Sequence, residues 1–140
     1  MDVIVTLYIE ATEPAKIQQY ENLLWDYARF SRKNQQQNGC SPVIPRQCEA
    51  FGGPGEPKYE VNGDVYKGPW GRLQNDGPAL RASTLIRFAI AYLAKGGNID
   101  RIKELYDGKY PAQTVVKVDL EYVAHRWYVA PFSLVFSLMS

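Results

Sequence analysis

The sequence has few of the residues that build metal or redox sites. Among its 140 residues there is one histidine, His125, and there are two cysteines, Cys40 and Cys48. The two cysteines lie in a proline-rich stretch and could close a short disulfide in an oxidising compartment, although the pair alone does not prove one. Because His125 is far from them in the sequence, we expect no metal site and no cofactor.

An excess of charge and a long apolar run are also missing. The formal net charge is +1, so composition points neither to nucleic acid nor to an anionic membrane as a partner. No apolar run reaches roughly 18 residues, which excludes an obvious membrane-spanning helix. Residues 1–7 lack the basic segment and cleavage site of a secretory signal. With 46% hydrophobic and 22% charged residues, the composition is that of one ordinary globular domain.

What the sequence does contain is apolar residues at helical spacing. Residues 2–10 form a short apolar segment that could be a strand or a helix by pattern alone. After them, start and stop signals and three- to four-residue spacing predict helices. The predicted spans are Ala15 to Lys33, Pro78 to Ala94, residues 99–106 and Ala112 to Tyr128.

Two of these helices carry a stripe that we expect to face the core. In the first the stripe is Ile17, Tyr20, Leu23, Leu24, Tyr27 and Phe30, and in the last it is Val116, Leu120, Val123 and Trp127. Trp25 is also expected in the core and His125 at the surface. The helix from Pro78 to Ala94 is apolar over most of its circumference, so it should have neighbours on several sides.

Residues 38–69 form a long proline- and glycine-rich loop, and a loop of this length is unusual unless it is functional. Within it, Asn62-Gly63 between alternating residues predicts a small hairpin over residues 58–66. At the other end of the chain, residues 129–140 form an apolar, uncharged tail that is an aggregation hazard if exposed.

The stretch from Gly68 to Ala82 joins a polar loop to a helix start. The loop carries Trp70 and Arg72, and Asp76 follows as a favoured N-cap, with Pro78 in the first turn. A loop held at a helix N-terminus suits a ligand site.

Residues 70–82 read Trp-Gly-Arg-Leu-Gln-Asn-Asp-Gly-Pro-Ala-Leu-Arg-Ala, which resembles a signature of fungal and yeast glucoamylases, except that Leu73 stands where that family usually has proline. Residues 55–59 and 119–127 are similar to further family segments, in the same order and spacing. The resemblance implies an all-α fold, a partial (α/α)6 barrel. Residues 1–140 would then be a single incomplete catalytic domain, with 129–140 as a divergent tail.

The resemblance also implies a reaction: exo-acting, inverting release of glucose from the non-reducing ends of starch, glycogen or maltooligosaccharides. Inversion needs two carboxyl groups, roughly 6.5–9.5 Å apart. The family's acid stretch aligns with residues 133–137, which contain no carboxylate, and its base would lie beyond Ser140. The family's glucose-clamping Trp-x-Arg-Asp would precede Val3. We therefore expect no catalytic residue in this chain, and no activity from it alone.

For substrate binding, the resemblance places Trp70 on the wall of a sugar cleft. An indole offers an apolar face and an N–H donor to a sugar, although a tryptophan packed under the loop is the other interpretation. Arg72 and Asp76 are weaker candidates, because Arg72 could pin the loop and Asp76 could only cap the helix. A non-catalytic glucan-binding protein and a helical interaction module remain alternatives. Family members are secreted or vacuolar, which leaves the compartment of this chain open.

Overall fold

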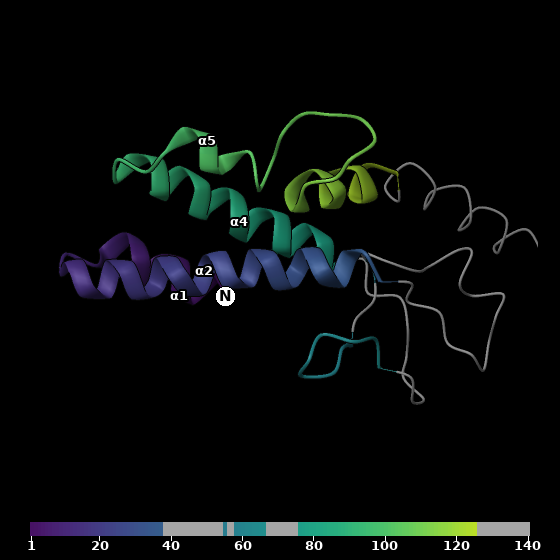
Figure 1. Ribbon diagram of the computed structural model, residues 1–140, viewed down its shortest axis with the longest axis horizontal. Coiled ribbons are helices and arrows are strands. Elements are labelled where there is room, and N and C mark those ends of the chain that lie inside the picture. Colours follow the sequence, from purple (N-terminus) through teal and green to yellow (C-terminus); the bar gives the residue numbers. More distant parts are fainter. Residues whose placement is uncertain (38–54, 56–57, 67–75, 126–140) are drawn as a thin grey trace, which may run out of the picture.

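The computed structural model describes residues 1–37, 55, 58–66 and 76–125. Its named helices are α1 (Asp2–Glu10), α2 (Pro14–Gln35), α4 (Asp76–Ala94) and α5 (Ile99–Ile102). A further helix begins at residue 115 and continues to residue 125, where the described part ends. No strand occurs in these ranges, so the all-α prediction is confirmed, and residues 2–10 are helical (Figure 1).

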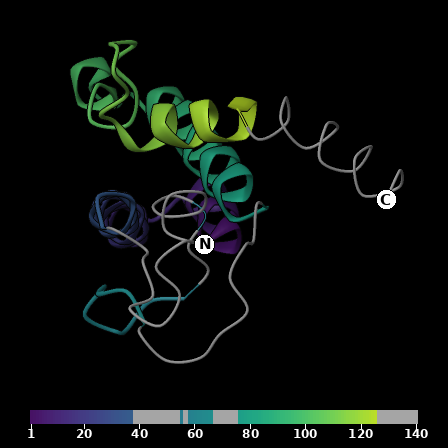
Figure 2. The ribbon, with the colours of Figure 1, turned by 90° about the vertical axis from the view of Figure 1, so that its right-hand side faces the viewer.

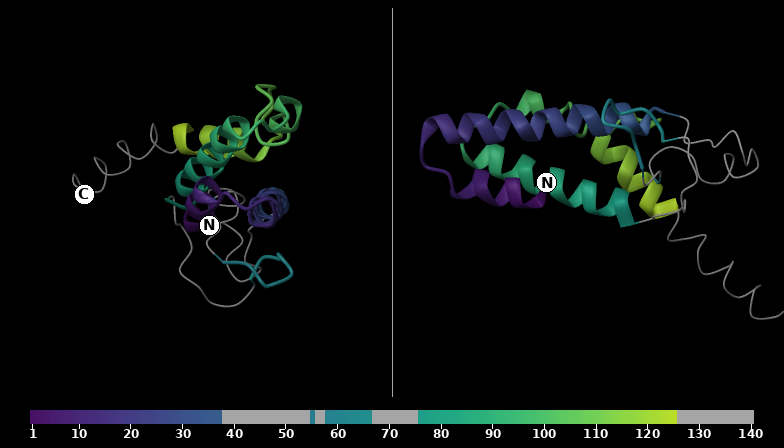
Figure 3. Two further views of the ribbon diagram at one scale, coloured as in Figure 1. Left: turned by 90° about the vertical axis from the view of Figure 1, so that its left-hand side faces the viewer. Right: turned by 90° about the horizontal axis from the view of Figure 1, so that it is seen from below.

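The three longer named helices pack against one another in pairs. α2 runs along the length of the described body, and α1 lies beside both α2 and α4 (Figure 3). The helix of residues 115–125 lies on one side of the C-terminal end of α2, and the hairpin of residues 58–66 lies on the other side (Figures 1 and 2). The start of α4 is at this same end of the body (Figure 1).

An aromatic cluster fills the centre of this packing. The Trp25 ring meets Phe88 edge-on at a centroid distance of 5.2 Å and Tyr92 at 5.6 Å. Tyr8 of α1 meets Phe88 at 5.6 Å, also edge-on, a geometry favoured by the ring quadrupoles. All four rings are buried, so the prediction that Trp25 is a core residue is confirmed.

Local signals set the ends of the helices close to where the sequence predicted them, except for α5, which ends at Ile102 rather than at residue 106. Pro14 occupies the first turn of α2, and Gly96 follows α4 with a φ of 82°, a left-handed conformation that glycine adopts without strain. The Asn98 side chain caps α5 by accepting a hydrogen bond from the Asp100 backbone N–H at 2.8 Å. The last helix begins at residue 115 rather than at Ala112, because the first carbonyl of its ladder is that of Thr114.

The predicted hairpin is confirmed, although its two arms are joined by a single bridge rather than by a longer ladder. Tyr59 and Val65 form an isolated antiparallel bridge, and Gly63 in the turn has a φ of 86°. The turn is closed by a hydrogen bond of 2.7 Å from the Glu60 backbone N–H to the Asp64 carbonyl. A positive φ suits glycine and explains the Asn-Gly pair in the sequence.

Parts of the predicted core stripes are wrong. Leu23 and Phe30 of α2 are 43% and 39% exposed, and Leu120 is 42% exposed. The C-terminal half of α2 instead buries polar residues, namely Ser31, Asn34 and Gln35, and the last helix buries Asp119. The stripes assume that a buried face is apolar, whereas here the buried faces include polar side chains, of which Gln35 and Asp119 are hydrogen-bonded to each other.

α4 is only partly covered within the described residues. Its buried side holds Leu85 and Phe88, as expected for a core helix. Its other apolar residues remain exposed to different degrees: Leu80 63%, Ile86 38%, Ile90 64% and Leu93 38%. The expectation of neighbours on several sides is met in part, since α1, α2 and the helix of residues 115–125 contact α4 while these side chains stay uncovered by the described residues. No helix in that part combines the length and apolarity needed to cross a bilayer.

Candidate functional site

The most constrained polar contact joins Arg81 in α4 to Asp119 in the last helix. Arg81 Nε donates to Asp119 Oδ2 at 2.7 Å, and Arg81 Nη2 donates to Asp119 Oδ1 at 2.5 Å. The Asp119 side chain is fully buried and that of Arg81 is 12% exposed. A planar guanidinium matches a carboxylate in this two-point geometry, so the contact fixes orientation as well as distance.

Gln35, the last residue of α2, extends this contact to a third element. Its Nε2 donates to Asp119 Oδ1 and to the Val115 carbonyl, both at 2.8 Å. The C-terminal end of α2, the beginning of α4 and the last helix are thereby tied together. We refer to Gln35, Arg81 and Asp119 as the buried polar triad.

Burial and charge act in opposite directions on the triad. Desolvation raises the pKa of the Asp119 carboxyl, and the hydrogen bonds from Arg81 and Gln35 partly oppose that shift. Burial would lower the pKa of Arg81, but Asp119 outweighs it, so the guanidinium pKa is raised and the group stays charged. Both carboxylate oxygens of Asp119 are engaged, so this group is not available as a general acid or base.

Two further contacts bring the hairpin region to the same end of the body. A Cβ added at Gly55 would lie 2.2 Å from the Tyr122 hydroxyl oxygen, so a larger residue there would require the Tyr122 side chain to shift. The Tyr59 hydroxyl donates to the Asn34 carbonyl at 3.4 Å. The three segments that carried the glucoamylase resemblance, beginning at Gly55, at Trp70 and at Asp119, therefore have described residues that meet at one end of the molecule.

The profile of "Glycosyl hydrolases family 15" matches residues 1–134. The chain belongs to glycosyl hydrolase family 15. The resemblance inferred from its motifs is confirmed, and the described helices are an all-α portion of the (α/α)6 fold of that family.

The curated relatives of this family 15 chain are longer proteins named glucoamylases. The chain is 46% identical over 136 residues to "Glucoamylase" of Blastobotrys adeninivorans. This alignment covers 96% of the chain and 20% of the Blastobotrys adeninivorans protein. It is 38% identical over 116 residues to "Glucoamylase 1" of Rhizopus oryzae, with coverages of 81% and 16%. "Probable glucoamylase" of Schizosaccharomyces pombe is 43% identical over 83 residues, with coverages of 59% and 17%. The chain thus spans a fifth or less of these relatives, and no solved structure matches it.

The predicted site residues of this family 15 chain are placed as follows. Trp70 and Arg72 lie outside the described residues, as do Cys40 and Cys48. Asp76 is exposed and is the first described residue of α4; the residue before it lies outside the described part of the chain, so the N-cap role of Asp76 stays a prediction. A carboxylate there is favourable next to the positive end of the helix dipole.

Sequence reasoning missed the buried polar triad as a functional element. Arg81 and Asp119 each lie within a segment that was recognised as family-like, and both interrupt the apolar pattern of their helices. That interruption was the available signal, because a charged residue on a buried helix face requires a partner. Outside the triad, His125 is exposed, as predicted.

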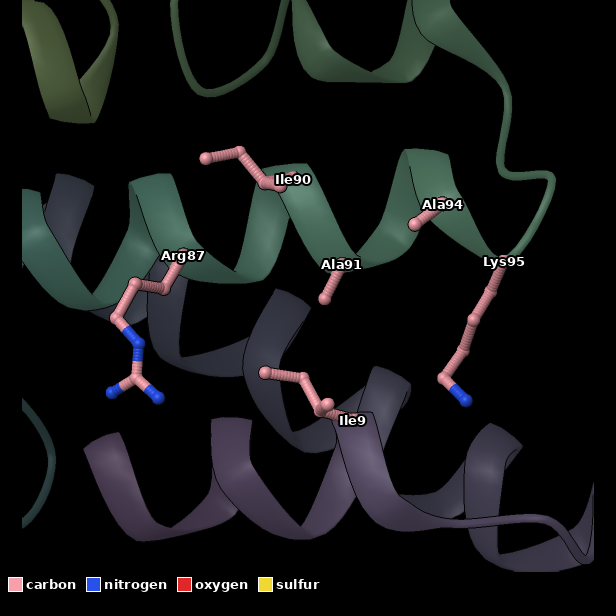
Figure 4. A pocket seen from close by; sticks show the side chains of 6 residues that line it. All are labelled: Ile9, Arg87, Ile90, Ala91, Ala94 and Lys95. Atoms are coloured by element: carbon pink, nitrogen blue, oxygen red, sulfur yellow. The ribbon is translucent and has the colours of Figure 1, made fainter.

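Two of the hollows formed by the described residues have no triad residue in their lining. The first, which we call the α1–α4 groove, has a volume of about 500 Å³ and is lined by Ile9, Arg87, Ile90, Ala91, Ala94 and Lys95 (Figure 4). The second, of about 260 Å³, lies beside Trp25 and is bordered by Arg29, Arg32, Lys33 and Glu104, among others. Neither is lined by Asp76 or by a member of the triad.

Proposed function

We propose that this chain contributes part of the sugar cleft of an inverting exo-glucosidase that releases glucose from α-glucans such as starch, glycogen or maltooligosaccharides. Membership of glycosyl hydrolase family 15 over residues 1–134 carries the proposal. The names of these relatives, all glucoamylases, support a glucan-hydrolysing reaction.

In this proposal Trp70 forms an aromatic wall of the cleft. A sugar presents a face of C–H groups that packs on an aromatic ring, and an indole N–H adds a hydrogen-bond donor. The segment that carries Trp70 and Arg72 leads directly into α4 at Asp76. The Arg81–Asp119 ion pair supports the proposal, since it anchors the first turns of α4 to two other helices.

We further propose that the 140 residues printed above do not hydrolyse glucans by themselves. An inverting reaction needs an acid and a base on opposite sides of the scissile bond, and this acid–base chemistry contributes roughly 10²–10⁴-fold in rate. Asp119, the buried carboxylate, is held in the ion pair. Residues 133–137, which align with the family's acid stretch, contain only Ser, Leu, Val and Phe.

A binding assay on insoluble starch tests the cleft. We expect the purified chain to be retained and Trp70→Ala to reduce retention at least fivefold. Tyr110→Ala is the matched control, because Tyr110 is an exposed aromatic residue at 87% exposure, and it should bind like the wild type. Equal retention of both variants, or none by the wild type, would contradict the assignment of Trp70.

A glucose-release assay on maltoheptaose tests the second statement separately. We expect the wild-type chain to release no more glucose than buffer alone. Retention on starch without glucose release would support the proposal that this chain binds glucans but does not catalyse their hydrolysis. Turnover that Trp70→Ala abolishes would show that the acid and base are present after all.

A further inference from the structure

The turn of the hairpin contains an Asn-Gly pair, Asn62-Gly63, in which the asparagine is exposed and the glycine is buried. Glycine has no Cβ, so its backbone nitrogen can come close to the side chain of the residue before it. An asparagine in this position can lose its amide without any enzyme, and asparagine is one of the heat-labile residues of proteins. The pair is therefore a candidate site of chemical modification.

The reaction needs only the pair itself and water. The Gly63 backbone nitrogen loses its proton and attacks Cγ of the Asn62 side chain. A new C–N bond closes a succinimide ring, and Nδ2 leaves as ammonia. Water then opens the ring at either of its carbonyls, which gives aspartate or isoaspartate at position 62. In isoaspartate the main chain runs through the side chain.

In the folded hairpin each reacting group is held by a hydrogen bond. The Gly63 N–H donates to the Glu60 carbonyl at 2.8 Å, which opposes loss of its proton. Asn62 Nδ2 donates to Asp64 Oδ2 at 2.9 Å, and Asn62 Oδ1 accepts from the Asp64 backbone N–H at 3.0 Å. A side-chain amide that is bound at both ends cannot turn towards the Gly63 nitrogen without breaking these contacts.

The C-terminal end of α2 restrains the main chain around the same bond (Figure 1). Lys33 Nζ donates to the Asn62 carbonyl at 2.7 Å, and Gln37 Nε2 donates to the Gly63 carbonyl at 2.6 Å. The attack requires rotation about the Cα–C bond of Asn62, which moves the Asn62 carbonyl together with the Gly63 nitrogen. The hydrogen bond from Lys33 opposes that rotation.

We propose that Asn62 is a deamidation site that the folded hairpin keeps unreactive, with Asp64 as the residue that holds its side-chain amide. Conversion then takes place only while the hairpin is open, and such local openings need less free energy than global unfolding. The proposal does not depend on the sugar cleft, because the hairpin and α2 provide every contact that it uses.

Conversion would also weaken the hairpin that protects the site. It replaces the Nδ2 donor by a carboxylate oxygen, and the atom it now faces is Asp64 Oδ2, at 2.9 Å in the unmodified chain. Two like charges so close repel each other, and the hydrogen bond is lost. The modified chain therefore cannot re-form the contact that protected Asn62.

Peptide mapping by mass spectrometry, after incubation at mildly alkaline pH, measures this conversion. It separates position 62 from the Asn38-Gly39 pair, which lies outside the described residues. We expect Asn62 to convert at least tenfold more slowly in the folded chain than in the same chain kept unfolded in guanidinium chloride. Asp64→Ala should accelerate conversion at least fivefold in the folded chain and leave the rate in the unfolded chain unchanged.

Asp26→Ala is the matched control. Asp26 is also an exposed aspartate, but it pairs with Arg29 on α2, away from the turn, so this variant should convert like the wild type. The proposal is wrong if Asn62 converts equally fast in the folded and unfolded wild type. Equal rates in folded Asp64→Ala and the folded wild type would contradict the role of Asp64.

The variant Asn62→Asp tests the effect of the product. The Glu60 N–H donates to the Asp64 carbonyl at 2.7 Å, so hydrogen exchange at the Glu60 amide reports opening of the hairpin. We expect this amide to exchange at least fivefold faster in Asn62→Asp than in the wild type. Unchanged exchange would show that a carboxylate at position 62 does not weaken the hairpin.

Discussion

Arg81 and Asp119, 38 positions apart in the sequence, form a two-point ion pair in which the carboxylate is completely buried. Gln35 donates a third hydrogen bond to the same carboxylate. Burying an ion pair is unfavourable unless its geometry is good and its hydrogen bonds are satisfied, and here both oxygens of Asp119 are engaged. The ion pair, together with Gln35, therefore fixes how α2, α4 and the helix of residues 115–125 pack against one another.

Asp119→Ala should destabilise the chain strongly, because it leaves the Arg81 charge buried without a partner. Breaking a buried pair on one side costs about 3–5 kcal/mol in free energy of unfolding. Urea unfolding followed by circular dichroism measures this loss. Asp100→Ala is the control, since Asp100 is an exposed residue whose pairing with Lys103 is at the surface, and it should change stability much less.

Replacing both partners by apolar residues should cost less than removing one. In Arg81→Met/Asp119→Leu neither charge is left unpaired, so we expect the double variant to be more stable than Asp119→Ala. If the double variant loses as much stability as Asp119→Ala, unpaired charge is not the cause of the destabilisation.

Phe88→Ala should remove the centre of the aromatic cluster. Phe88 is fully buried and touches Tyr8, Trp25 and Tyr92, so truncation leaves a cavity and costs about 3–5 kcal/mol. Phe30→Ala, at 39% exposure, removes the same atoms from the surface and should cost clearly less. Thermal unfolding compares the two variants, and similar melting temperatures would contradict this assignment of the core.

Gly55→Ala should be destabilising although it adds a single methyl group. The added carbon would overlap the Tyr122 hydroxyl, and such overpacking costs about 1–3 kcal/mol. Gly77→Ala in α4 is the matched control, because nothing lies within 4 Å of its added Cβ and alanine is the better helix former. We expect Gly77→Ala to be neutral or stabilising, and Tyr122→Ala to relieve the loss caused by Gly55→Ala.

Alkaline pH should lower the free energy of unfolding, because the buried Tyr8 side chain loses its proton. Desolvation, with smaller contributions from Glu21 and Tyr92, raises the pKa of Tyr8 to about 12. The folded state therefore holds the phenolic proton more tightly than the unfolded state, in which the pKa is near 10. The stability that results is fully present below pH 10 and is lost as the pH rises towards 12.

The variant Tyr8→Phe isolates this contribution, since phenylalanine has no proton to lose. Between pH 9 and pH 11 the wild type should lose about 1 kcal/mol more stability than Tyr8→Phe. Urea unfolding at the two pH values measures the difference. Parallel losses in the two proteins would show that Tyr8 does not carry this pH dependence.

The helices could be predicted from the sequence because their signals are local. Pro14 and Gly96 mark the ends of helices through their own backbone preferences, and the 3.6-residue period needs no knowledge of the neighbours. The hairpin could be predicted for the same reason, since Asn62-Gly63 specifies its turn.

The triad could not be predicted from the spacing of residues within one helix, because its three members lie in different helices and meet only in the folded protein. Arg81 and Asp119 interrupt the apolar pattern of their helices and so require a partner, but neither helix alone shows that the partner is the other residue or that Gln35 joins them. Only the tertiary contact shows that these residues pair with one another. Their helices bury polar side chains, whereas Phe30 and Leu120, which were expected in the core, are exposed.

The hairpin is anchored in part through its main-chain groups. Lys33 donates to the Asn62 carbonyl, and Gln37 donates to the Gly63 carbonyl and accepts from the Val65 N–H, at 2.6–2.9 Å. Anchoring of this kind does not depend on which side chain stands at Val61. A fluorescent dye or an affinity tag attached at this position would therefore report on the protein without altering its folding.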